Sequence, residues 1–416
     1  MATEKRARFD HVVVLLKENL TFDWVFGRFP GANGMHLRHA ANPPRFPPGA
    51  SMIFGGPPHG NLAYRMWGDQ QGRLARLSSK QQFDGHDVWL HYRLARQYTL
   101  CDNYFSSVRG PSTPNYLHML AASSGGKTTL SAAPEGLPVS TGMVNNPRGR
   151  VIRFLTHSRE PQPPFDMPTL PGLLERAGYT WRNYGSLTVP LVRSLQSTSN
   201  NRGTEDFFVD VAQGRLPNLS FLMSPDGADE SPVSGTVKGE LFSARVLRAV
   251  RDHDYWRSTA VIVTWDDWGG LFDHVRPPVK ELRSDGSPYG WGLRVPTLLI
   301  SPYSSPGVCS QENSHDSIPR FVEDNFGLVA ERGLPYLNHR DEASNGLSAC
   351  YDFTQPPLGA PTDETLTPPP RAVTPRRHRV PVPLERLGHR RALRRLSTGS
   401  QFPIPVPTHR GVDLDA

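Results

Sequence analysis

The chain has few cysteines and no long hydrophobic run. Only Cys101, Cys309 and Cys350 occur among 416 residues, and their wide, irregular spacing predicts neither a disulfide framework nor a CxxC-type metal site. No stretch approaches the roughly 18 consecutive apolar residues that a membrane-spanning helix needs. The N-terminus combines charges with a brief apolar run and shows no signal-peptide cleavage pattern. For the chain as given we therefore expect a cytoplasmic protein without a transmembrane segment, and its oligomeric state is left open.

Positive charge is concentrated near the C-terminal end. Residues 355–416 contain ten Arg, five acidic residues and twelve Pro, so they hold +5 of the formal net charge of +7. A solvated, disordered tail has this composition, and contact with an anionic membrane or nucleic acid is the alternative. We predict a folded domain over residues 1–354, a disordered tail over 355–416 and no specific nucleic-acid partner. Gly- and Pro-rich stretches at about 27–73 and 125–168 predict long loop or cap insertions in the domain.

Strand-like and helix-like patterns alternate through the domain. Continuous apolar runs predict buried strands at residues 11–16, 260–264 and 295–301. Apolar spacing of three to four residues, together with capping residues such as Thr169 and Ser317, predicts helices at 169–178, 239–252 and 317–327. This alternation predicts an α/β fold with a mostly parallel sheet flanked by helices.

Acidic and amide side chains follow two of the predicted strands. Asp266 and Asp267 come directly after one strand, and Glu18 and Asn19 follow the other. Open α/β sheets bind ligands at the carboxyl ends of their strands. If the two strands are neighbours, these four side chains converge, and their oxygens suit one divalent cation. The alternative is that each pair only forms a polar turn after a core strand.

A serine stands at the predicted start of a helix, in the segment GPSTPNYLHMLAA. Ser112 or Thr113 can act as the N-cap, with Pro114 in the first turn. The free N–H groups and the dipole of a helix N-terminus stabilise an oxyanion or a phosphate. A serine there can be a nucleophile if a metal lowers its pKa, and the alternative is a capping role alone.

Five segments, in order along the chain, resemble one family of bacterial phosphoesterases. This family includes phosphatidylcholine-hydrolysing phospholipases C and a class of acid phosphatases, and it belongs with the alkaline phosphatase superfamily. The segments are FDHVVVLLKENLTFDWVFGRFPGANG (9–34), YTLCDNYFSSVRGPSTPNYL (98–117), WDDWGGLFDHV (265–275), GLRVPTLLISPYSSPG (292–307) and HDSIPRFVEDNFGL (315–328). The resemblance implies an alkaline-phosphatase-like fold and a metal-dependent hydrolase of phosphate esters, with phospholipids among the candidate substrates. Most members of the family are exported.

The resemblance also implies roles for individual residues. Glu18, Asn19, Asp266 and Asp267 would bind one divalent metal of unpredicted identity. Ser112 would be both a ligand and the nucleophile, which gives a phosphoseryl intermediate.

Further residues complete the implied site. His59 and His274 are the candidates that bind phosphate or protonate the leaving alcohol, because histidine titrates in the useful pH range. Asn115 and Asp273 are expected to contact the substrate. Thr113 and His315 are additional candidate site residues.

The chain departs from the family pattern at several positions. The family commonly has Glu-His-Pro where this chain has Glu230-Ser231-Pro232, so a histidine with a role in proton transfer is lost. Tyr116 replaces a histidine that often follows the Pro-Asn of the nucleophile segment, and Asp-His-Thr-Ser appears as Ser-His-Asp-Ser at 314–317. The alternative function is therefore a catalytically weakened relative that binds a phosphorylated or anionic ligand.

Overall fold

The computed structural model describes residues 9–44, 80–126, 163–186, 188–197, 199–282, 286 and 288–370. The chain divides into two compact units, Met1–Pro369 and Pro370–Ala416, and the second lies outside the described residues except for its first residue. Among the described helices, none has the length and apolar character needed to cross a membrane.

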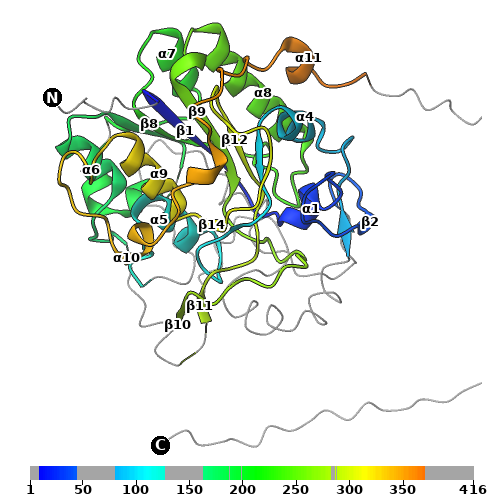
Figure 1. Cartoon of the computed structure of the whole chain (residues 1–416), viewed down its shortest axis with the longest axis horizontal. Coiled ribbons are helices and arrows are strands. Elements are labelled where there is room, and N and C mark those ends of the chain that lie inside the picture. Colours follow the sequence, from blue (N-terminus) through cyan, green and yellow to red (C-terminus); the bar gives the residue numbers. More distant parts are fainter. Residues whose placement is uncertain are drawn as a thin grey trace, which may run out of the picture. The chain divides into compact units, whose positions relative to one another are not determined.

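An eight-stranded sheet forms the centre of the first unit (Figure 1), in the order β13-β4-β12-β9-β1-β8-β6-β7. Its strands are β1 His11–Lys17, β4 Thr99–Cys101, β6 Trp181–Tyr184, β7 Asn201–Arg202, β8 Leu219–Met223, β9 Thr259–Trp265, β12 Thr297–Ile300 and β13 Gly307–Cys309. The strand β12 runs antiparallel to both of its neighbours, and all the other neighbouring pairs are parallel. The predicted mostly parallel sheet is confirmed.

Helices cover both faces of this sheet (Figure 1): α4, α7 and α8 lie on one side and α5, α6 and α9 on the other. The α-helices are α1 Phe22–Phe26, α4 Trp89–Gln97, α5 Ser112–Ala121, α6 Leu170–Arg176, α7 Asp206–Ala212, α8 Val237–Asp252, α9 Ser317–Asn325, α10 His339–Glu342 and α11 Asp363–Leu366. Coverage on both faces explains the continuous apolar runs, because every residue of β9 and all of β1 except His11 are buried.

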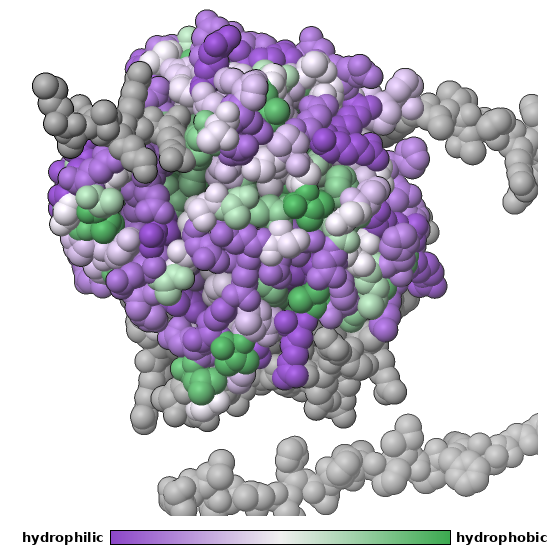
Figure 2. All heavy atoms as spheres, viewed as in Figure 1, coloured by the Kyte–Doolittle hydropathy of each residue, from purple (hydrophilic) through white to green (hydrophobic). Residues whose placement is uncertain are grey.

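Smaller elements connect these layers. The short strands are β2 Arg38–His39, β3 Gln81–Gln82, β5 Tyr104–Phe105, β10 Glu281–Leu282, β11 Pro288–Gly290 and β14 Asn313–Ser314. Single 3₁₀ turns are η2 Val189–Leu191, η3 Arg193–Leu195, η4 Trp256–Ser258 and η5 Ser348–Cys350. On the face shown in Figure 2, hydrophobic residues are scattered among a majority of hydrophilic ones.

Two of the predicted helix caps are wrong. Pro111 is the N-cap of α5 and Asp316 is the N-cap of α9, so Ser112 and Ser317 are each the first helical residue instead. The Thr169 cap is confirmed, since its hydroxyl accepts a hydrogen bond from the Gly172 amide at 3.2 Å. The correction at α5 matters for function, because the Ser112 hydroxyl is not used to cap its own helix.

One disulfide is present, although the cysteine spacing indicated no disulfide framework. Cys309 and Cys350 are linked, across a separation of 41 residues. Spacing alone could not show this link, because it depends on the chain returning after α10 to the edge of the sheet, where β13 lies. Cys101 remains a buried free thiol.

Part of the predicted tail packs against the domain. The helix α11 contacts α4 and α8, and Leu366 is fully buried. Arg248 donates from Nη2 to the Leu366 carbonyl at 2.7 Å, and Arg251 pairs with Asp363 at 2.9 Å. The first part of the predicted tail, residues 355–370, is therefore structured, although the composition changes at 355. The predicted disorder of 371–416 and most of the two predicted insertions lie outside the described residues.

Candidate functional site

The polar residues that follow β1 and β9 lie next to one another. These strands are direct neighbours and pair in parallel, with Lys17 opposite Trp265. The next residues therefore leave the sheet at the same edge, and the Asn19 amide donates to Asp266 Oδ1 at 2.8 Å. The condition on which the predicted cluster depended, that the two strands are neighbours, is confirmed.

The Ser112 hydroxyl lies between two carboxylates at the start of α5. Its Oγ is 3.4 Å from Glu18 Oε2 and 3.3 Å from Asp267 Oδ2, and the side chain is buried. Three segments far apart in sequence thus bring Ser112, Glu18, Asn19, Asp266 and Asp267 together. We call these five residues the Ser112 cluster.

A tight turn after Asp267 makes this arrangement sterically feasible. Gly269 has a φ of +58°, and a Cβ on it would lie 2.1 Å from the Asn19 carbonyl oxygen. Asn19 itself has a φ of 58°, a left-handed conformation that asparagine tolerates better than most residues. The Gly269 amide also donates to Asp267 Oδ1 at 2.7 Å. The Gly-Gly sequence is therefore needed for the close approach of the two loops.

The Ser112 cluster contains three buried acidic groups, Glu18, Asp266 and Asp267. Burial and the adjacent Asp266 raise the pKa values of Glu18 and Asp267 well above their usual range. Burial raises the pKa of Asp266 to about 6. Within the described parts of the chain, neither Glu18 nor Asp266 forms an ion pair, and Asp266 Oδ2 is buried without a hydrogen-bond partner. Carboxylate, amide and hydroxyl oxygens around such a point fit a hard divalent cation.

Two aromatic side chains hold members of the cluster in place. Tyr116 donates its hydroxyl to Glu18 Oε1 at 2.6 Å. Burial lowers the pKa of His315 to about 4, so this imidazole is neutral. Its Nε2 lies 2.7 Å from the Asp266 carbonyl oxygen, which can only accept, so Nε2 carries the proton. Sequence reasoning missed the role of Tyr116, although its i+4 spacing from Ser112 places both on one face of α5.

A second buried cluster uses the next part of the same loops. Arg294 Nε pairs with Asp273 Oδ1 at 2.9 Å, and its Nη2 pairs with Asp23 Oδ1 at 3.2 Å. His274 Nδ1 lies 2.8 Å from Asp23 Oδ2. We call these four residues the Arg294 cluster. Asp23, Asp273 and His274 have the geometry of a metal site, but the fully buried Arg294 already supplies a cation there.

The remaining predicted site residues have different surroundings. Asp273 and His274 belong to the Arg294 cluster, with no described contact to Ser112. The Asn115 amide is bonded to the backbone of the loop before α5, at Val108, Gly110 and Pro111. Their predicted roles, and that of buried Thr113, stay predictions. His59 lies outside the described residues.

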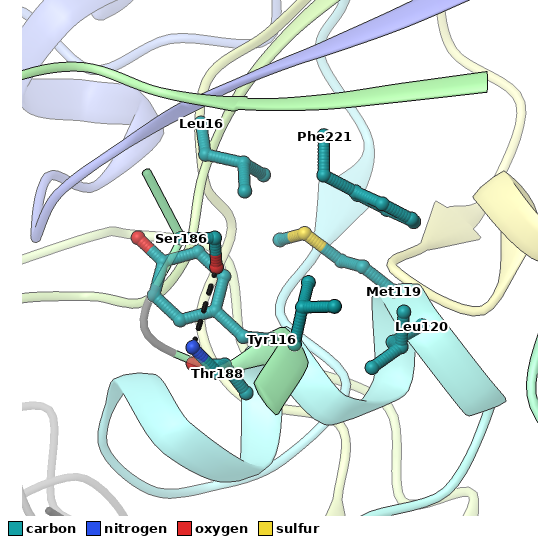
Figure 3. Close-up of a pocket in the computed structure, with 8 residues that line it drawn as sticks. Leu16, Tyr116, Met119, Leu120, Ser186, Thr188 and Phe221 are labelled. Atoms are coloured by element: carbon teal, nitrogen blue, oxygen red, sulfur yellow. Dashed lines mark hydrogen bonds between the residues drawn. The ribbon is translucent and has the colours of Figure 1, made fainter. Parts of the chain in front are cut away.

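A very small cavity lies behind Tyr116, between α5 and the sheet (Figure 3). Its walls include Leu16, Phe221 and Met119, and its volume of about 10 Å³ is roughly that of one water molecule. A larger pocket of about 410 Å³ is lined by residues from the other end of α5, including His118 and Ala122. Ser112 is not among the residues that line either space.

Several known proteins are similar to this chain in sequence. The chain is 25% identical to a hemolytic phospholipase C of Pseudomonas aeruginosa, over 82% of this chain and 56% of that protein. It is 27% identical to a non-hemolytic phospholipase C of the same organism, over 83% of this chain and 58% of that protein. The chain thus spans little more than half the length of these relatives. It is also 25% identical to phospholipase C A of Mycobacterium tuberculosis, over 84% of this chain and 78% of that protein.

Solved structures with a similar fold are more distant. One is a protein in the alkaline phosphatase superfamily from Vibrio parahaemolyticus, with a TM-score of 0.37 and 13% identity over 79% of this chain and 71% of that one. Murine ectonucleotide pyrophosphatase/phosphodiesterase 5 has a TM-score of 0.40 and 9% identity, over 78% of this chain and 96% of that one. The model of the Phosphoesterase family matches residues 9–329, which include both clusters. The chain therefore belongs to the Phosphoesterase family.

Proposed function

We propose that this chain hydrolyses phosphate esters, with Ser112 as the nucleophile and one divalent cation held by the Ser112 cluster. The observation that carries the proposal is the position of Ser112 Oγ, 3.4 Å from Glu18 Oε2 and 3.3 Å from Asp267 Oδ2 at the first residue of α5. A serine in such surroundings has a proton acceptor beside it and helix N–H groups in front of it.

The chain's own residues account for the two halves of the reaction. The Ser112 proton passes to a neighbouring carboxylate, and Oγ attacks phosphorus as the bond to the leaving alcohol breaks. This gives a phosphoserine and the free alcohol, which takes up a proton. Water then attacks phosphorus, which releases phosphate or a phosphomonoester and restores the serine. The start of α5 favours the anionic oxygens through both steps, since the positive end of its dipole lies there.

A divalent cation fits the charge of the site. The five residues of the Ser112 cluster would hold it. Asp266 Oδ2 supports this, because it is buried without a hydrogen-bond partner and a bound cation would give it a partner. When bound, such a cation polarises phosphoryl oxygens and favours loss of the serine proton. Tyr116 and His315 fix the orientation of Glu18 and Asp266, as partners of metal ligands commonly do.

The proposed substrates follow from the named relatives. The matched proteins are phospholipases C, so a phosphodiester of a lipid is the first substrate to test. A small phosphomonoester is the second. The alternative, binding of a phosphorylated ligand without turnover, is favoured by one observation. Ser231, at the family's histidine position, is buried, and its hydroxyl is 3.1 Å from Ser234 Oγ.

The experiment compares turnover by metal-loaded wild type and Ser112→Ala. The substrates are p-nitrophenyl phosphate, p-nitrophenyl phosphorylcholine and phosphatidylcholine vesicles. Wild type is expected to turn over at least one of them, and Ser112→Ala is expected to lose about 10³-fold or more in kcat. The exposed Ser310→Ala is the matched control and should retain activity.

Three results would change the proposal. Equal activity of wild type and Ser112→Ala would contradict the assigned nucleophile. Stabilisation of the protein by phosphate without any turnover would support the ligand-binding alternative. An absence of both effects would contradict both functions.

A further inference from the structure

All three cysteines of the chain meet at one edge of the sheet. Cys309 in β13 and Cys101 in β4 are opposite one another on neighbouring strands. Cys350 is disulfide-bonded to Cys309, and the Cys101 Sγ lies 4.0 Å from the Cys350 Sγ. Cys101 and Cys350 are fully buried, whereas Cys309 retains 8% exposure. A free thiol therefore stands directly beside a disulfide.

We propose that this edge is a thiol–disulfide exchange site, in which Cys350 changes partner between Cys309 and Cys101. The Cys101 thiolate attacks Cys350 Sγ, a new bond forms between these sulfurs, and the bond from Cys350 to Cys309 breaks. Cys309 leaves as a thiolate and takes up the proton that Cys101 has lost. The exchange conserves electrons, so no external oxidant or reductant is consumed.

The resting form has the link from Cys309 to Cys350, and the surroundings of Cys101 slow the exchange. Burial and the neighbouring Asp102 raise the pKa of the Cys101 thiol, so the attacking thiolate is rare. The titratable groups around it are Asp102, Tyr104 and Tyr351. Exchange is therefore slow in the closed protein and faster when this edge of the sheet opens locally or when the pH is high.

Exchange has two structural consequences. The free thiol moves from Cys101, in the interior of the sheet, to Cys309 in the edge strand β13, where reagents reach it more easily. It also replaces the covalent loop over residues 310–349, which carries His315, by a larger loop over residues 102–349. His315 Nε2 donates to the Asp266 carbonyl at 2.7 Å. The disulfide that is present therefore changes how tightly the chain is restrained around a residue that contacts the Ser112 cluster.

The main test maps disulfides in Cys309→Ser, which removes the resting partner. The full chain is oxidised in a glutathione redox buffer, its free thiols are alkylated, and unreduced peptides are identified by mass spectrometry. The expected result is a Cys101–Cys350 link in most molecules. Cys101→Ser is the matched control and should keep the Cys309–Cys350 link. If Cys101 and Cys350 are both alkylated in Cys309→Ser that has a wild-type circular dichroism spectrum, the proposal is overturned.

A second measurement uses wild type, in case the variant does not fold. Wild type is incubated at a series of glutathione ratios and at pH 7 and pH 9, then acid-quenched and mapped in the same way. A population with alkylated Cys309 and a Cys101–Cys350 link is expected, with faster formation at pH 9. If every molecule that keeps a disulfide has alkylated Cys101 instead, Cys350 has a single partner. Neither test depends on the proposed hydrolase activity.

Discussion

The Ser112 cluster and the Arg294 cluster share the segments that follow β1 and β9, yet their charges are balanced in different ways. Asp266 and Asp267 begin one loop, and Asp273 lies six residues further along it. All three are buried. Asp273 is paired with Arg294 at 2.9 Å, whereas the described ion pairs include none for Asp266. The Arg294 cluster thus contains a buried cation of its own, and the described ion pairs give none to Asp266.

This difference separates a structural ion pair from a candidate metal site. A buried carboxylate without a partner is costly, so it keeps a proton or binds an external cation. Burial raises the pKa of Asp273, but Arg294 opposes that rise. In the Ser112 cluster burial and the neighbouring carboxylates act in the same direction on Glu18 and Asp267. We therefore place the proposed metal in the Ser112 cluster, although Asp23, Asp273 and His274 have the geometry of a metal site.

The largest expected effect on stability is in the Arg294 cluster. Asp273→Asn removes a carboxylate from a fully buried arginine, which should lower the free energy of unfolding by about 3–5 kcal/mol. Denaturant unfolding at pH 7 measures it. The control is Asp166→Asn, whose partner Arg193 is 58% exposed, and a change below about 1 kcal/mol is expected there. A small effect of Asp273→Asn would remove the contrast between the two clusters.

Glu323 is a third case, because it is a buried carboxyl group outside both clusters. Burial and Asp341 raise its pKa to about 9. Between its ordinary pKa of 4.5 and about 9, the folded state binds more protons than the unfolded state, so stability falls as pH rises. Glu323→Gln should be more stable than wild type by roughly 4 kcal/mol at pH 8 and by less than about 1 kcal/mol at pH 5. Melting curves at both pH values measure this difference.

The two pH values make the Glu323 prediction specific. An equal stability gain at pH 5 and pH 8 would show that titration of Glu323 is not the cause. A stabilising effect of divalent cations that disappears in Glu323→Gln would show that an uncompensated carboxyl group elsewhere also binds metal. That outcome would weaken the assignment to the Ser112 cluster.

The smallest expected effect concerns Tyr116. Tyr116→Phe removes the 2.6 Å hydrogen bond to Glu18 Oε1 and leaves the ring in place. Because partners of metal ligands tune affinity, we expect the affinity for a divalent cation to fall roughly tenfold. Calorimetric titration of chelator-treated protein measures the change. Tyr303→Phe, a change in a partly buried tyrosine that packs against Phe9, is the control. Equal affinities in the three proteins would show that Tyr116 does not orient Glu18.

Much of the fold could be predicted because local patterns determine it. The apolar runs of β1 and β9 exist because helices cover both faces of the sheet. The convergence of Glu18 and Asp266 needed one further fact, that their strands are neighbours, and no local pattern contains it. The resemblance to a family supplied the same residues in a single set.

Other features could not be predicted because they depend on distant segments. Arg294 precedes the strand β12, and nothing in the surrounding sequence indicates a buried arginine. Its pairing with Asp273 could therefore not be predicted. The Cys309–Cys350 link depends on how the chain returns after α10. The sequence also left the N-cap of α5 open between Ser112 and Thr113, and it is Pro111, because the helix begins one residue earlier than its hydroxyl residues suggested.

The most direct test of the central claim is thermal melting of chelator-treated wild type and Asp266→Asn, with and without Mg²⁺, Mn²⁺, Ca²⁺ or Zn²⁺. We expect Asp266→Asn to melt above wild type without metal, because the substitution removes an uncompensated buried charge. We also expect at least one cation to raise the Tm of wild type by several degrees and that of the variant much less. If no cation stabilises wild type and Asp266→Asn melts below it, the Ser112 cluster is not a metal site.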